Sequence, residues 1–359
     1  MNLKFSKMVA MVKSLKSLVL LGVVIMSASC WNNAGGERIS LSENYSESVP
    51  AEKVFSIVND AIELQEDTSF VLNTVKKIVA ASDGVYLTDG TVICHYGQDG
   101  HLMSCISRQG RGSGEYMGIM DFDVDGNIVY VLDMNKKFIG YDSIGNLLQE
   151  KAMDFYPASF MIDDDRIVMT SAYQESGDKF IVLNKLDLRK IGSFFPINEN
   201  ELTWRHFMGQ SNFFRYKDEV LFHEPMNCAV QTIRKDTVSV KYVFDFWNRN
   251  APESFWREKH RDVFAINQEA TANNYCYGIP YYAENDNAIV MTYRDGAFYR
   301  MLRYDKRKHQ SVEFAAIVFP DKTEPVAIGD LCLQFHSESS MWIARYDGDG
   351  RALLYSVEL

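Results

Sequence analysis

The first stretch whose residue types could do chemistry is glycine-rich and runs from Arg108 to Tyr116 as RQGRGSGEY. Closely spaced glycines let a backbone wrap around a phosphate, but that chemistry also needs a helix that begins immediately after the loop. The run that follows, residues 116–124, has the alternating pattern of a strand. We therefore interpret the glycines as a tight structural joint in which they supply positive φ angles.

A second stretch contains closely spaced carboxylates, and it reads DFDVDGN over residues 121–127. It resembles the first half of a calcium-binding loop, which requires a glutamate at its twelfth position. Leu132 occupies that position here. The pattern therefore predicts a hairpin turn at Asp125-Gly126 rather than a calcium site.

The seven histidines include no pair at the short spacing of a local metal motif. His95, His223 and His336 lie in strand-like runs in three separate parts of the chain. They are the alternative candidates for a divalent metal site, if the fold brings them together. The favoured interpretation is that they are scattered strand residues, and no cofactor is predicted.

Aromatic and basic residues gather in segments that lack a strand pattern. Rings of this kind suit a sugar or a peptide, but they could equally pack onto the outside of the fold. The candidate ligand-binding residues are Trp204, Arg205, His206, Trp256, Tyr281 and Tyr282.

The cysteines show no C-x-x-C motif. Cys94 and Cys105 flank one predicted hairpin, but simple strand pairing places them two positions out of register. That offset favours free thiols over a disulfide.

A turn pattern recurs along the chain and indicates how these residues are positioned. An aromatic or apolar residue ends one strand, a short turn follows, and another strand begins. The markers stand at positions 96, 141, 183, 233, 304 and 346. All steps but one match the roughly 40–50 residues of a four-stranded propeller blade. The long step contains Pro252 and a helix-like run to Phe264, which predicts a helical insertion at about 248–277.

These markers predict an all-β fold, a six-bladed β-propeller with a short helical insertion, over residues 54–359. Blades have two apolar faces, and a closed ring buries both of them. We expect the strand-like run 61–65 to complete the last blade beside residues 352–358. The alternative, in which the two ends simply abut, stays open.

Residues 1–30 have the features of an export signal: four lysines, a short apolar run at 18–26, and small residues before Cys30. The interpretation favoured here is a lipoprotein signal with Cys30 as the lipidated residue, and the alternative is ordinary signal cleavage. Residues 31–53 are polar and are expected to be a flexible tether.

The net charge is −11, and residues 1–29 contribute no acidic residue. The exported part is therefore more acidic than the whole chain, which argues against nucleic-acid binding.

Residues 106–148 resemble the NHL-type repeat, through the connector 108–116 and the strand runs Phe122-Asp123-Val124 and Tyr130-Val131-Leu132-Asp133. The whole layout resembles the six-bladed propeller lipoproteins of Bacteroides-type bacteria. Ser113 departs from the family connector, which usually has proline there. The resemblance implies a cell-envelope protein, and it implies little about activity.

We therefore expect a lipid-anchored, monomeric binding or scaffold module for a glycan, a peptide or an envelope protein. The membrane is contacted through the lipid anchor only. The outer membrane is favoured over the inner, because no aspartate follows Cys30. The alternative function is a metal-dependent propeller lyase or hydrolase that acts at the channel mouth.

Overall fold

The structure is a computed structural model of the chain. It describes residues 35–41, 45–65, 72, 74–172, 177–197, 201, 212–224, 226–235, 237–252, 254–255, 258, 260–348 and 350–359. The chain divides into two units, Met1–Gly35 and Gly36–Leu359. Nearly all of the first unit, including Cys30, lies outside the described residues, so the fold below is that of the second unit.

The first half of this unit consists of three separate antiparallel sheets of four strands each. The first sheet contains β5 (Lys77–Ala81), β6 (Gly84–Thr88), β7 (Ile93–Gly97) and β8 (Leu102–Ile106). The second contains β9 (Ile119–Asp125), β10 (Ile128–Asp133), β11 (Lys137–Asp142) and β12 (Leu147–Ala152). The third contains β13 (Pro157–Asp163), β14 (Arg166–Ser171), β15 (Asp178–Asn184) and β16 (Lys190–Pro196).

The second half repeats the plan with additions. One group contains β17 (Phe213–Tyr216), β18 (Glu219–His223), β19 (Ala229–Arg234) and β20 (Thr237–Asp245). The next contains β21 (Cys276–Tyr277), β22 (Tyr282–Glu284), β23 (Ala288–Asp295), β24 (Phe298–Asp305), β25 (Gln310–Val318) and β26 (Val326–Ala327). The last contains β27 (Cys332–Ser337), β28 (Ser340–Tyr346) and β29 (Ala352–Glu358).

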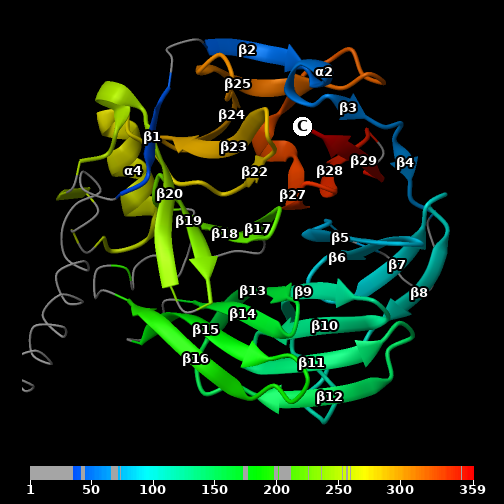
Figure 1. Cartoon of the computed structure of the whole chain (residues 1–359). Helices are drawn as coiled ribbons and strands as arrows, with labels where there is room; N and C mark the ends of the chain where they lie inside the picture. The colour runs from blue at the N-terminus through cyan, green and yellow to red at the C-terminus, as the bar shows by residue number, and fades with distance from the viewer. Residues whose placement is uncertain are drawn as a thin grey trace, which may run out of the picture. The chain divides into compact units, whose positions relative to one another are not determined.

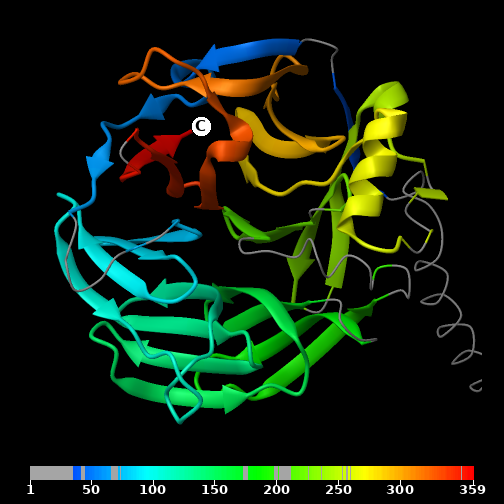
Figure 2. The same cartoon turned by 180° about the vertical axis from the view of Figure 1, so that it is seen from behind.

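The sheets stand around a common centre, and one strand of each group faces it (Figures 1 and 2). The inner strands contact one another in a closed order, which is β5, β9, β13, β17, β22, β27 and again β5. Strands β17 and β27 also pair with each other in parallel, through Arg215 and Ser337. This arrangement is a β-propeller, as the repeat predicted.

The recurring turns join β7 to β8, β11 to β12, β15 to β16, β19 to β20, β24 to β25 and β28 to β29. Five of the six turns share one contact: a side-chain oxygen accepts backbone N–H groups two to four residues further on. Asp142 accepts from Ile144 and Asn146, and Asp305 accepts from Arg307 and Lys308. These bonds stabilise the ionised carboxylate and lower the pKa of Asp142 and of Asp305. The repeat is therefore visible in the sequence because one local turn closes each outer hairpin.

Part of the segment before the first sheet forms strands, although the sequence predicted a flexible tether there. The expected tether at 31–53 was wrong for β1 (Glu37–Ser40) and β2 (Tyr45–Pro50), which pair in parallel with β20 and β25. Both strands lie on sheet edges and expose polar side chains, so their composition resembles that of a linker. By contrast, β3 (Ile57–Val58) and β4 (Ile62–Glu63) pair with β29, which confirms the expected closure.

The helical insertion is also confirmed. Helix α4 (Val263–Asn273) begins at Asp262, whose carboxylate accepts from the Ala265 N–H at 2.9 Å. It ends at Asn274 in the left-handed conformation. The short helices among the described residues are α2 (Ala51–Val54), η3 (Trp247–Arg249) and η4 (Ile328–Asp330). None of the helices in the described part of the chain has the length and apolar character that crossing a bilayer requires.

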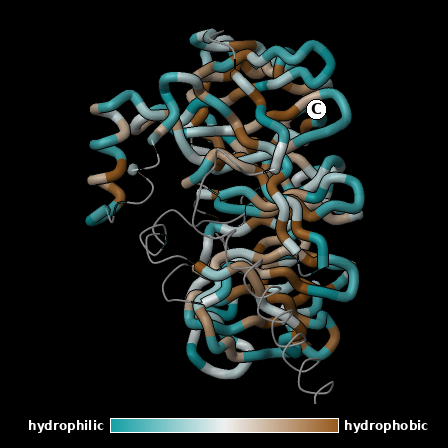
Figure 3. The backbone as a smooth tube through the Cα atoms, turned by 60° about the vertical axis from the view of Figure 1, so that its left-hand side comes forward, coloured by the Kyte–Doolittle hydropathy of each residue, from teal (hydrophilic) through white to brown (hydrophobic). Residues whose placement is uncertain are grey.

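Hydrophobic residues follow the strands and hydrophilic ones follow the turns (Figure 3). Successive sheets bury their facing apolar side chains between them. The first and second sheets, for example, share a cluster that contains Tyr86, Tyr116, Phe122 and Tyr141. The interfaces in the first half of the ring are thus small cores, whereas one larger cluster joins the last three groups of strands.

The glycine-rich joint is structural. Tyr116 is fully buried, and its hydroxyl lies 3.0 Å from the carbonyl oxygens of both Thr91 and Ile106. Gly114 adopts φ +67°, and the Gly112 N–H donates to the Glu115 carboxylate at 2.7 Å. The joint therefore ties the first sheet to the second, and no helix follows it.

The expectation of free thiols at Cys94 and Cys105 was wrong, because the two cysteines form a disulfide. A bulge between His95 and Tyr96 shifts the register of β7 and β8 and places the two cysteines directly opposite. Their Cα atoms lie 4.2 Å apart, as in the narrow pairs of an antiparallel ladder. The offset predicted from the sequence had been counted for a regular hairpin without this bulge.

Candidate binding site at the channel mouth

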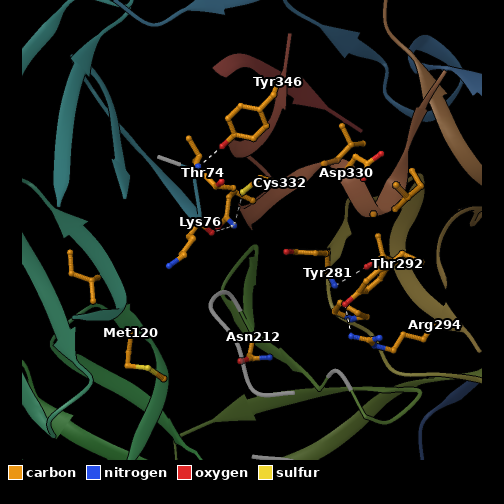
Figure 4. A pocket seen from close by; sticks show the side chains of 18 of the residues that line it. Thr74, Lys76, Met120, Asn212, Tyr281, Thr292, Arg294, Asp330, Cys332 and Tyr346 are labelled. Carbon is orange, nitrogen blue, oxygen red and sulfur yellow. Dashed lines mark hydrogen bonds between the residues drawn. The ribbon is translucent and has the colours of Figure 1, made fainter. Parts of the chain in front are cut away.

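A cavity of about 580 Å³ opens at the end of the ring where the inner strands begin (Figure 4). Its volume falls in the range of about 300–1,000 Å³ that is typical of ligand pockets. It is lined by residues 74–76, 119–120, 280–281 and 328–332, together with Met134, Asn212, Thr292, Arg294, Tyr299, Gln334 and Tyr346.

The fold explains why such distant segments meet. Residues 74–76 directly precede β5, Asn212 precedes β17, and residues 280–281 precede β22. Because the inner strands run in the same sense around the centre, their entry segments converge at one end of the ring. Loops held in this way by a rigid scaffold are the usual place for recognition.

Tyr281 projects into this cavity, with its hydroxyl directed toward the centre (Figure 4). Its backbone N–H donates to the Thr292 hydroxyl at 3.1 Å, which fixes the segment that carries the ring. Burial raises the pKa of Tyr281, so the hydroxyl stays protonated and can donate a hydrogen bond to a ligand.

Two other tyrosines of the lining are held by neighbours. The Tyr346 hydroxyl accepts from the Val75 N–H. The Arg294 guanidinium donates to the Tyr299 hydroxyl, and its carbon lies 4.5 Å from the centre of the Tyr299 ring. That distance fits a cation–π contact, so one face of the Tyr299 ring is already occupied.

The channel beyond the cavity contains buried charges that hold the inner strands together. Lys77 of β5 and Asp121 of β9 form an ion pair at 2.5 Å, with 3% and 0% of their side chains exposed. Asp121 also accepts from the Phe160 N–H of β13 at 2.9 Å. Burial raises the pKa of Asp121, and the nearby Lys77 opposes that shift. One carboxylate therefore links three neighbouring sheets.

His336 of β27 reaches the same channel, and its Nε2 lies 3.9 Å from the Asp123 carboxylate. Burial lowers the pKa of His336, and Lys77 and Arg215 lower it further, while Asp123 raises it. The imidazole is thus neutral at pH 7.

The other two histidines have unrelated partners. His95 stacks on Tyr86, with ring centres 4.0 Å apart, and its Nε2 lies 3.2 Å from Asp83. His223 Nδ1 lies 2.6 Å from the Ile279 carbonyl. Within the described ranges, no group of three or more His, Cys, Asp or Glu side chains is placed to hold a metal ion. The hypothesis that His95, His223 and His336 converge on a metal was therefore wrong.

The structure separates the predicted ligand-binding residues. Tyr281 lies in the cavity, whereas Tyr282 points away from it, is fully buried and packs edge-on against Phe214. Alternation along a strand places consecutive residues on opposite faces, so only one of the pair could line the site. Trp204, Arg205, His206 and Trp256 lie outside the described residues.

Sequence reasoning missed most of the lining, including Lys76, Tyr299, Asp330 and Tyr346. These residues are single members of unrelated segments, so no local spacing connects them. The available signal was positional: several lining residues directly precede an inner strand.

The fold and the cavity define a propeller with a ligand-sized pocket at its channel mouth. Residues 37–325 match the family model described as "Domain of unknown function (DUF4934)". The chain therefore belongs to the DUF4934 family. Among curated proteins, none matches this chain.

Solved structures with a similar fold include one from Bacteroides fragilis that is described as an exported protein. It has a TM-score of 0.67 and 15% identity, over 90% of this chain and 100% of that one. BamB from Moraxella catarrhalis has a TM-score of 0.43 and 7% identity, over 84% and 98% of the two chains. The first of these similarities supports the fold, and neither assigns a ligand.

Proposed function

We propose that this chain is a cell-envelope lipoprotein with six propeller blades, which binds a glycan, a peptide or an envelope protein at the cavity around Tyr281. The observation that carries this proposal is the cavity of about 580 Å³, which the entry segments of several inner strands line together. Its tyrosine and methionine side chains offer apolar contact, and Tyr281 offers a hydrogen-bond donor. Such a combination suits recognition.

The envelope location rests on the signal features of residues 1–30, with Cys30 as the lipid anchor and the outer membrane favoured over the inner. The protein is proposed to act as a monomer. Each strand group contributes one inner strand to the ring, which supports the six-blade count.

Replacing Cys30 with alanine is expected to move the protein from the membrane fraction to the soluble envelope fraction. Each buried CH₂ of an attached acyl chain contributes about 0.8 kcal/mol of membrane affinity, and all of it is lost with the thiol. Fractionation of cells followed by immunoblotting measures the change. Cys228→Ala is the control and should stay in the membrane fraction. Membrane retention of Cys30→Ala would contradict the lipid anchor.

Binding at the cavity is tested with a panel of oligosaccharides and short peptides and the purified protein, by thermal shift. A ligand at about 100 times its Kd stabilises the folded state by about 2.7 kcal/mol. We expect at least one probe to raise the Tm of the unmodified protein, and Tyr281→Ala to abolish that shift. Tyr156→Ala is the control, because Tyr156 is an exposed tyrosine outside the cavity. An equal shift in Tyr281→Ala, or no shift with any probe, would contradict the proposed site.

A further inference from the structure

The apolar part of the cavity contains methionine side chains. Met120 and Met134 both line it, and Met134 and the nearby Met117 are 60% and 41% exposed. The Met134 N–H donates to the Gly118 carbonyl at 2.9 Å, so this rim of the cavity is anchored through its backbone. Unbranched thioethers adapt to apolar side chains of different shapes, which is a property of peptide-binding surfaces.

The aromatic residues of the cavity are poorly arranged for a sugar. Carbohydrates are commonly held by an open aromatic face, yet Arg294 covers one face of the Tyr299 ring. Tyr346 is held by the backbone of Val75 through its hydroxyl. Tyr281 presents its hydroxyl to the cavity (Figure 4). These rings therefore provide edges and hydroxyl groups more than a stacking platform.

Two exposed charges of opposite sign stand on opposite sides of the cavity, Lys76 and Asp330 (Figure 4). Lys76 precedes β5, and Asp330 ends η4. Neither side chain forms an ion pair or hydrogen bond with another residue of the described ranges. Two opposite charges that line a shared cavity from different sides, without partners among the described residues, are complementary to a ligand that carries both signs.

We propose that the ligand is a short peptide segment, which places an apolar side chain against the methionines, an acidic group near Lys76 and a basic group near Asp330. This inference rests on the proposed function, since it names the ligand class of the same cavity. A neutral glycan supplies neither charge, and an acidic glycan supplies only one of them.

The test is a selection of random short peptides displayed on phage against the purified protein. Peptides from the unmodified protein are expected to share an apolar residue flanked by an acidic and a basic residue. Repeating the selection on Lys76→Glu should replace the preferred acidic residue with a basic one. Asp330→Lys should replace the preferred basic residue with an acidic one. Lys190→Glu, on the exposed outer strand β16, is the control and should leave the preference unchanged.

Affinity measurements by calorimetry with one selected peptide extend the test. Lys76→Gln removes the charge with little change in size and is expected to weaken binding about two- to fivefold, the range for a solvent-accessible ion pair. Raising the ionic strength should weaken binding to the unmodified protein and have less effect on Lys76→Gln. Circular dichroism establishes that each variant is folded.

The outcomes separate the two proposals. Selected peptides without a charge preference, or with one that neither substitution changes, would overturn the peptide inference. Oligosaccharides that bind in a Tyr281-dependent manner, while no peptide does, would also overturn it but would leave the binding site in place. If neither class of probe binds at the cavity, the inference and the proposed function both fail.

Discussion

Replacing Lys77 with methionine is expected to lower the free energy of unfolding by about 3–5 kcal/mol, the usual loss when one member of a buried ion pair is removed. The substitution leaves the Asp121 carboxylate buried without its cation. Because Asp121 also holds the Phe160 N–H, the loss affects the junction of three sheets. Urea unfolding followed by fluorescence measures it.

Further variants test whether the loss of stability comes from the ion pair between Lys77 and Asp121. Lys190→Met removes an exposed lysine of β16 and should change the stability by less than about 0.5 kcal/mol. Adding Asp121→Asn to Lys77→Met should recover part of the loss, because no unpaired charge then remains.

Burial raises the pKa of Asp121, so the folded variant takes up a proton more readily than the unfolded chain. The loss should therefore shrink as the pH falls toward the ordinary aspartate value of about 3.9. Equal unfolding midpoints for Lys77→Met and Lys190→Met would contradict the role of this ion pair.

Removing the disulfide is expected to have the next largest effect. Substituting both Cys94 and Cys105 with alanine should lower the free energy of unfolding by about 3 kcal/mol, the chain-entropy value for cysteines separated by 11 residues. Unfolding of the unmodified protein in the presence of a thiol reductant should show a similar loss. The double variant should not respond to the reductant. An unmodified protein whose midpoint stays the same after complete reduction would show that the bridge does not stabilise the fold.

The architecture was predictable because its signal is local. Each outer hairpin closes with a short turn, and oxygens such as that of Asp142 accept N–H groups only a few residues away. Such turns leave a similar pattern in most of the repeats, whatever other residues the blade contains. The closing role of residues 61–65 was also predictable, since a ring needs a partner for its last strand.

The remaining features depend on contacts between distant segments. β1 and β2 are polar edge strands whose partners lie some 200 or more residues away, so their sequence alone resembles a linker. The Cys94–Cys105 pairing depends on a bulge that composition does not reveal. In the cavity, only Tyr281 was foreseen, because it follows the insertion in an aromatic run. Lys76 and Asp330 line the cavity from different sides, and nothing in the sequence near either residue indicates the other.

The pairing of β3 and β4 with β29 has a consequence for how the chain reaches its native state. Residue 63 pairs with residue 353, so β3 and β4 leave the ribosome early and wait for a partner strand that is made last. Contacts of such long sequence separation make folding slow, and strands without partners are prone to associate with other chains. The last sheet can therefore be completed only after β29 has been made, and a chain that stops before residue 352 would leave β3 and β4 without their partner strand.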